Sequence, residues 1–88
     1  MKYKLGKLPE KEGFVFFPEI LFELIKQKKL DFDCILIYGW IKYLNIKPPE
    51  ENLDNFLKLF ETHTNLSKKR MKEAYQKLND VVDLWETT

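Results

Sequence analysis

The segment from Cys34 to Leu44 restricts the fold of this chain more than any other part of its sequence. Every residue in it except Lys42 is apolar, aromatic or glycine. A helix of this kind has almost no polar side to turn toward water, so we expect it to lie at the centre of its domain. Asp31 or Asp33 is suited to cap its N-terminus, and the Pro48-Pro49 pair prevents its continuation.

Gly39 lies in the interior of this predicted helix. Glycine at such a position costs about 1 kcal/mol of stability relative to alanine. The usual compensation is that a large ring or another stretch of backbone approaches the helix closely. We therefore expect a close neighbour at position 39.

The remaining elements follow from hydrophobic spacing and from capping residues. We predict a strand over Phe14–Phe17, a helix from Pro18 to about Lys29, a helix over Leu53–Thr62 capped by Asn52, and a closing strand over Val81–Trp85. Two short strands are unstable alone, so they are expected to pair near the two ends of the chain. Together with the basic helix described below, this gives a mainly α fold of the α+β class, with four helices and two short strands.

The length of 88 residues and the net charge of +1 define the general character of the chain. Residues 1–12 are predicted to form a basic N-terminal arm carrying Lys2, Lys4, Lys7 and Lys11, and residues 13–88 a single domain. The single cysteine, Cys34, cannot form an internal disulfide. No segment has the apolar character of a signal peptide or a membrane span, so we expect a cytoplasmic protein without membrane contact.

A basic helix is predicted from Ser67 to about residue 79. Ser67 is suited to the N-cap, and Met71, Ala74 and Leu78 recur at helical spacing and can face a core. Cations fill the first turn, where the helix dipole prefers anions. An anionic partner, with DNA phosphate as the clearest candidate, would explain this arrangement, whereas a solvated lysine-rich face is the alternative.

The candidate nucleic-acid-binding residues are the polar and basic side chains of this helix: Ser67, Lys68, Lys69, Arg70, Lys72 and Gln76. Arg70 is best suited to read a base, because a guanidinium group can bond guanine through two donors. The lysines are better suited to phosphate, and Gln76 to either the groove or solvent.

Catalysis has little support in the sequence. His63 is the only histidine, and both possible partners, Ser67 and Cys34, have simpler roles as a helix cap and a core residue. One histidine and one cysteine cannot complete a zinc site, and no glycine-rich phosphate loop is present. We therefore expect no enzyme, no metal and no cofactor.

Two stretches resemble known DNA-binding domains. Leu66–Leu78 resembles the recognition helix of winged-helix domains, with a hydrophobic residue, Ser, basic residues, a hydrophobic residue and a later Leu. Phe16–Leu21 and Asp33–Gly39 are similar to the opening of plasmid and phage replication-initiator N-terminal domains. The resemblance implies a winged-helix-like domain, with a helix-turn-helix and a minimal wing, that binds double-stranded DNA in replication or transcription control of a mobile element.

The region between the third and fourth predicted helices departs from that pattern. Asn65 stands where a small residue is usual, and Phe60 to Leu66 is longer than a tight turn. Either the third helix extends through His63 or the turn is enlarged. Asn65 is suited to a left-handed conformation, which fits a helix end.

Two classes of function stay open at this point. The first is the non-catalytic DNA-binding protein, for which a homodimer would supply the contacts that one short recognition helix lacks. The second is a small phage-encoded inhibitor, of the anti-CRISPR kind, that binds a host protein or nucleoprotein complex. The near-zero net charge and the minimal wing favour the second class, and the basic start of the helix favours the first.

Overall fold

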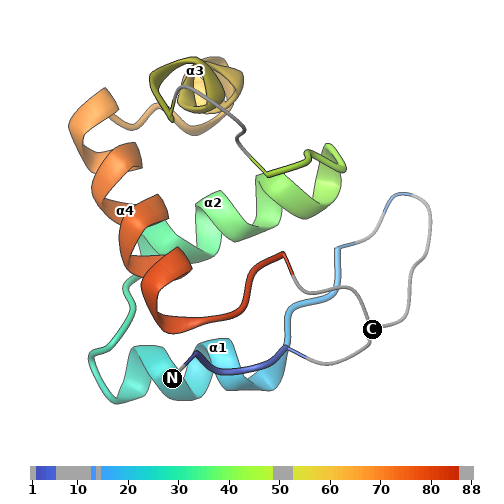
Figure 1. The fold of residues 1–88 in the computed structure, drawn as a ribbon, viewed down its shortest axis with the longest axis vertical. Coiled ribbons are helices and arrows are strands. Elements are labelled where there is room, and N and C mark those ends of the chain that lie inside the picture. The colour runs from blue at the N-terminus through green and yellow to red at the C-terminus, as the bar shows by residue number, and fades with distance from the viewer. Residues whose placement is uncertain (1, 6–12, 14, 49–52, 86–88) are drawn as a thin grey trace.

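Four α-helices make up the regular structure of the part of the chain that the computed structural model describes, namely residues 2–5, 13, 15–48 and 53–85. They are α1 (Glu19–Lys26), α2 (Phe32–Tyr43), α3 (Leu53–Thr64) and α4 (Lys68–Val81) (Figure 1). No strand or sheet occurs within these residues. The α+β prediction, with its two paired strands and minimal wing, is therefore wrong, and the described domain is all-helical.

Both predicted strands are replaced by other structure. Val81 is the last residue of α4, so the first residue of the predicted closing strand is helical. Val15–Phe17 forms no ladder, and the ring of Phe17 instead packs against Tyr38 of α2 at a centroid distance of 5.6 Å. The β-branched and aromatic residues of both segments therefore serve helix packing, which overrides their strand propensity.

A single parallel bridge joins Tyr3 to Val82 in place of the predicted strand pair. The Tyr3 N–H donates to the Val81 carbonyl oxygen, and the Asp83 N–H donates to the Tyr3 carbonyl oxygen, both at 2.8 Å. Leu5 packs against the core beside this bridge. The start of the predicted basic arm therefore runs along the end of α4, while residues 6–12 lie outside the described residues.

Three helices are followed by non-glycine residues with left-handed backbone conformations. Lys28 follows α1 with φ 63°, Asn45 follows α2 with φ 52°, and Asn65 follows α3 with φ 58°. After α1, the N–H groups of Lys28 and Lys29 donate back into the last turn, the arrangement of a Schellman motif. This turn ends α1 at Lys26, earlier than the predicted Lys29, and Asn65 has the conformation predicted for it.

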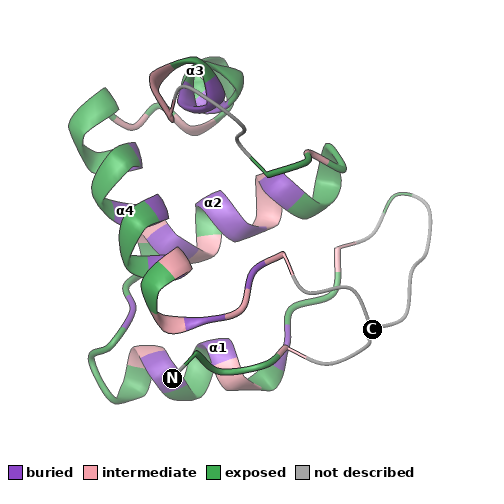
Figure 2. Ribbon diagram, viewed as in Figure 1, coloured by how far each residue is buried: buried purple, intermediate pink, exposed green. Residues whose placement is uncertain are grey.

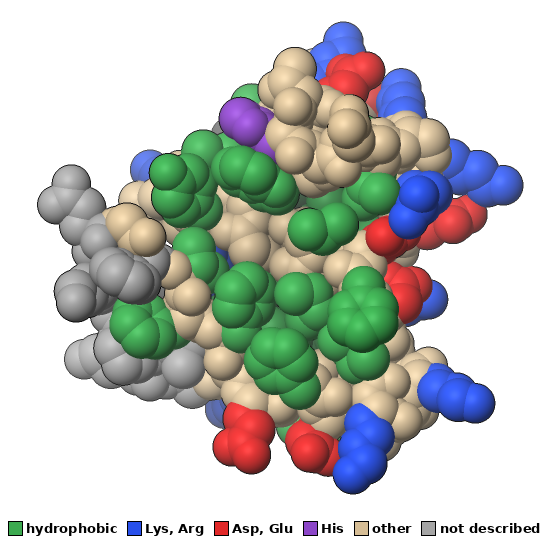
Figure 3. Space-filling model, turned by 180° about the vertical axis from the view of Figure 1, so that it is seen from behind, with side chains coloured by type: hydrophobic (Ala, Val, Ile, Leu, Met, Phe, Trp, Pro, Cys, Tyr) green, Lys and Arg blue, Asp and Glu red, His purple; other side chains and the backbone are tan. Residues whose placement is uncertain are grey.

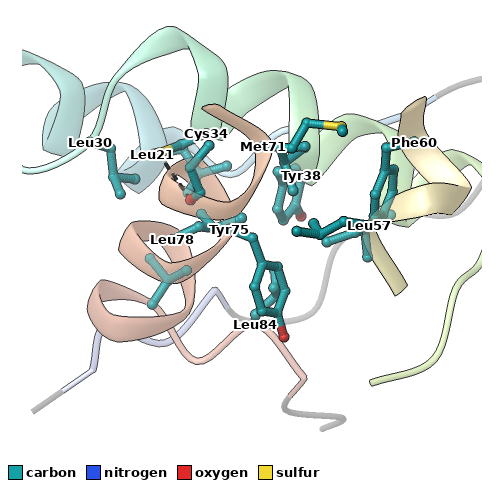
Figure 4. Packing of buried hydrophobic residues seen from close by; sticks show 14 of the residues in the cluster. Leu21, Leu30, Cys34, Tyr38, Leu57, Phe60, Met71, Tyr75, Leu78 and Leu84 are labelled. Carbon is teal, nitrogen blue, oxygen red and sulfur yellow. Dashed lines mark hydrogen bonds between the residues drawn. The ribbon is translucent and has the colours of Figure 1, made fainter. Parts of the chain in front are cut away.

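The core lies between α2, α3 and α4, and α1 adds buried side chains to it. Fully buried side chains come from each helix, and they include Leu21, Leu24, Ile37, Tyr38, Ile41, Leu57, Phe60, Met71 and Leu78. Tyr38, Leu57, Phe60 and Met71 gather between α2, α3 and α4 (Figure 4). α2 thus contributes the central contacts that its apolar sequence predicted.

One side of α2 is nevertheless exposed. Phe32 is 73% exposed and Tyr43 is 60% exposed, and Leu36 between them is also open to solvent. Buried and exposed stretches alternate along the helix (Figure 2). The expectation that this helix lies at the centre of the domain is therefore met only by its inner face.

Candidate nucleic-acid interface

α3 and α4 are joined by a tight turn of three residues, Asn65, Leu66 and Ser67. The Thr64 hydroxyl donates to the Phe60 carbonyl oxygen at 3.2 Å and accepts from the Leu66 N–H at 3.3 Å, which fixes the chain as it leaves α3. α3 continues through Thr64, so the open question of an enlarged turn is resolved in favour of a longer helix. The two helices cross rather than run side by side (Figure 1).

Ser67 caps the N-terminus of α4, as its sequence position predicted. Its Oγ accepts a hydrogen bond from the Arg70 N–H at 3.2 Å, and its carbonyl oxygen accepts from the Met71 N–H at 2.9 Å. The hydroxyl is therefore part of the helix start. Its contribution to an interface is to orient the first turn, in which Lys68, Lys69 and Arg70 lie.

The buried side of α4 is formed by Met71, Ala74, Tyr75 and Leu78. The remaining candidate residues are therefore distributed over two flanks and the outward side of the helix. The two flanks and the outward side have different neighbours, so the six predicted residues do not form one uniform basic surface.

Arg70 lies on the flank that faces the start of α2. Its Nε and Nη2 donate to Oδ2 and Oδ1 of Asp33 at 3.0 and 2.8 Å, a bidentate ion pair. The hydrogen bonds and charge of Asp33 raise the pKa of Arg70 above its ordinary value. Two donors that the sequence suggested for guanine are thus already bound to a carboxylate, and Arg70 must exchange one partner for another before it reads a base.

Two lysines are paired in the same way. Lys77 Nζ lies 3.0 Å from Asp31 Oδ2, which raises the pKa of Lys77. Lys68 Nζ lies 3.3 Å from Asp54 Oδ2 on the flank that faces α3. Acids on α3 and at the start of α2 therefore compensate three of the cations on α4.

Lys69, Lys72 and Gln76 occupy the outward side of α4, and all three are exposed. None of them forms an ion pair or hydrogen bond with another described residue. By their spacing, Glu73 lies one turn beyond Lys69 and Asp80 lies one turn beyond Gln76, so acidic side chains border this side of the helix as well. We call Lys69, Lys72 and Gln76 the outward face of α4.

The residues considered for catalysis are held apart in structural roles. The His63 ring stacks on Trp40 at 4.5 Å between centroids. Cys34 is buried in the core, where burial raises the pKa of its thiol to about 11. Within the described residues, no three His, Cys, Asp or Glu side chains come together to hold a metal ion.

Sequence reasoning did not identify Asp31, Asp33 and Asp54 as partners of the basic helix. The Arg70–Asp33 pair joins positions 37 residues apart, and the Lys77–Asp31 pair joins positions 46 apart. No local spacing rule connects such positions. The acidic residues at the start of α2 could be recognised only as candidate helix caps.

Comparison with known proteins gives no match, because no family model, curated protein or solved structure is significantly similar to this chain. Within the described residues, no helix combines the length and apolar character needed to cross a membrane.

Proposed function

We propose that this protein binds double-stranded DNA without catalysing a reaction, through the outward face of α4. The observation that carries the proposal is that Lys69 and Lys72, next to Gln76, are exposed on the second helix of a tight helix-turn-helix and form no ion pair with another described residue. In such modules the second helix enters the major groove and its N-terminal part approaches the bases.

The roles of these side chains follow from their chemistry. Lys69 and Lys72 are compact cations that hold phosphate groups without selecting a sequence. Gln76 lies one turn beyond Lys72, and its amide is suited to adenine, to which it can both donate and accept. The sequence resemblance to replication-initiator domains is what supports the proposal that such binding acts in replication or transcription control of a phage or plasmid.

A titration against DNA tests the proposal. A fluorescent random duplex is titrated with the full chain at 50 and 200 mM salt, and binding is followed by anisotropy. Each phosphate contact contributes about 0.9 to the slope of log affinity against log salt concentration. Lys69→Ala combined with Lys72→Ala should therefore lower the slope by about 2.

The matched control removes the same charge elsewhere. Lys26 lies in the last turn of α1 and Lys47 follows α2, and both are exposed. Lys26→Ala combined with Lys47→Ala should leave the slope close to that of the unchanged chain. Absence of salt-sensitive binding at micromolar protein, or an equal effect of both double variants, would refute the proposal.

The host-inhibitor function remains a second candidate. The observation that favours it is the pairing of Lys68, Arg70 and Lys77 with acids of the same chain, so that Lys69 and Lys72 are the cations of α4 without an ion-pair partner among the described residues. The titration separates the two candidates, because a protein-binding inhibitor has no need of salt-sensitive binding to a random duplex.

A further inference from the structure

Exposed apolar side chains from α1, α2 and the segment before α1 gather on one side of the molecule. On α2, Phe32, Leu36 and Tyr43 recur at intervals of four and seven residues and are exposed. Figure 3 shows hydrophobic side chains gathered across the middle of this side, with charged groups at its edge. We call this surface the aromatic face, and its residues are Phe17, Phe22, Phe32, Leu36, Trp40 and Tyr43.

Ring contacts hold the aromatic face in place. Phe17 lies directly over Gly39, since a Cβ at position 39 would be 3.2 Å from its Cζ. Phe22 meets Phe17 edge-on at 6.4 Å, and Tyr43 meets Trp40 edge-on at 5.6 Å. These contacts hold Phe17, Phe22, Trp40 and Tyr43 in place before any partner binds, which lowers the entropy cost of association for this part of the face.

The size of the aromatic face fits a protein interface. Phe32, Tyr43 and Phe22 are 73, 60 and 50% exposed, and Leu36 and Phe17 add smaller areas. With about 200 Å² for each large side chain, these residues leave about 500 Å² of apolar surface in water. A stable interface covers about 800 Å² per partner, including its polar rim, so this apolar area would form the larger part of one.

The rim of the aromatic face carries both signs of charge. Glu19 and Lys26 flank Phe22 on α1, and Lys42 lies beside Tyr43 on α2. A rim of one sign would repel an identical copy and would favour an oppositely charged partner. A mixed rim on an apolar centre is compatible with the same surface on a second molecule, as a two-fold interface requires.

We propose that the aromatic face is the interface of a homodimer. Phe32 and Tyr43 would be its anchors, since they are large, exposed and placed at the two ends of the α2 stripe. The inner side of α2 contacts α4, and no residue of the aromatic face belongs to the outward face of α4. The two surfaces share no residue, so dimer formation can be measured without DNA.

Sedimentation velocity of the full chain between 5 µM and 1 mM provides the test. The unchanged chain should shift with concentration from the 10.7 kDa monomer toward twice that mass. Phe32→Glu replaces one anchor of the proposed contact by a charge and should raise the dimer Kd at least tenfold, as loss of an interface anchor does. Gln76→Glu, which adds the same charge on α4, should leave the Kd unchanged.

Two further measurements check that the variants are folded and that the dimer forms through this face. Circular dichroism establishes that each variant remains helical, and Tyr43→Lys provides a second variant if Phe32→Glu fails to fold. Amide NMR shifts on dilution should be confined to α1, α2 and residues 15–18. If the unchanged chain stays monomeric at 1 mM, the homodimer proposal is wrong, and the aromatic face would have to bind a different partner. If a dimer persists in both variants, the dimer forms through a different surface.

Discussion

At the scale of single residues, Cys34 shows that the contact between α2 and α4 excludes solvent. Its Sγ lies 3.5 Å from the Ala74 carbonyl oxygen, to which the thiol donates, and the side chain has no exposed surface. Burial raises the pKa of this thiol to about 11, because the thiolate would lose its hydration. The thiol is therefore a protonated core group at neutral pH.

We expect Cys34 to react slowly with a thiol reagent such as DTNB. At pH 8 the raised pKa alone reduces the thiolate fraction about a hundredfold relative to an ordinary cysteine, and burial slows access further. Absorbance after mixing should show slow labelling of the folded chain and rapid labelling in guanidinium chloride. Equal rates in both conditions would contradict the buried position.

Gly39 and Phe17 show what local sequence can and cannot predict. The expectation of a close neighbour at Gly39, either a large ring or another stretch of backbone, is confirmed, because the Phe17 ring lies over it. The identity of that ring was not predictable, since Phe17 belongs to a segment whose aromatic residues have strand propensity. Propensity describes a segment by itself, whereas the position of Phe17 depends on Tyr38 and Gly39, which lie 21 and 22 residues later in the sequence.

At the scale of elements, helix starts were more predictable than the strands and the ion pairs. Ser67 and Asp31 cap α4 and α2 by accepting N–H groups three residues ahead, which is a local property of the sequence. The outward positions of Lys69 and Lys72 likewise follow from helical spacing. The neutralisation of Arg70 by Asp33 depends on how α2 and α4 pack, and it was therefore beyond local rules.

Asp31 links two elements and should make stability depend on pH. One carboxylate oxygen accepts from the Cys34 N–H at 3.2 Å, and the other accepts from Lys77 Nζ at 3.0 Å. Burial acts to raise the pKa of Asp31, but these hydrogen bonds outweigh it and hold the pKa below the ordinary value of 3.8. Its stabilisation is therefore fully present above about pH 4 and is lost as the pH falls through the lowered pKa.

We expect Asp31→Ala to reduce the free energy of unfolding by about 1 kcal/mol at pH 7, the usual effect of losing an N-cap. Asp31→Asn retains an acceptor for the Cys34 N–H and should cost less. Urea unfolding at pH 7 and pH 3 measures the free energy of unfolding of both variants and of the unchanged chain. The difference between the unchanged chain and Asp31→Asn should narrow at pH 3, and a difference that widens would contradict the sign of the pKa shift.

At the scale of the whole molecule, the first described residues are tied to the end of α4. Tyr3 exchanges two backbone hydrogen bonds with Val81 and Asp83, its hydroxyl accepts from Lys29 Nζ at 2.9 Å, and Leu5 packs against the core. These contacts connect the start of the chain to α1 and α4. The fold is thus closed by residues that the sequence assigned to a basic arm.

Deletion of residues 1–5 should therefore destabilise the domain. Two lost hydrogen bonds at about 1 kcal/mol each, with part of the Leu5 burial, give an expected loss of about 2–3 kcal/mol. Tyr3→Ala keeps both backbone bonds and serves as the control, with a smaller loss. Urea midpoints compare the three chains, and a deletion as stable as the full chain would show that the bridge contributes nothing.

The three ion pairs of α4 also affect how the molecule interacts with its ionic surroundings. If the proposed DNA complex forms and Arg70 or Lys77 leaves its carboxylate for a phosphate, the DNA would release a counterion, but Asp33 or Asp31 would take up a cation from solution. The number of ions released to solution then changes very little. The salt dependence of DNA affinity would therefore reflect the cations that have no carboxylate partner among the described residues, rather than all 15 lysines and arginines of the sequence.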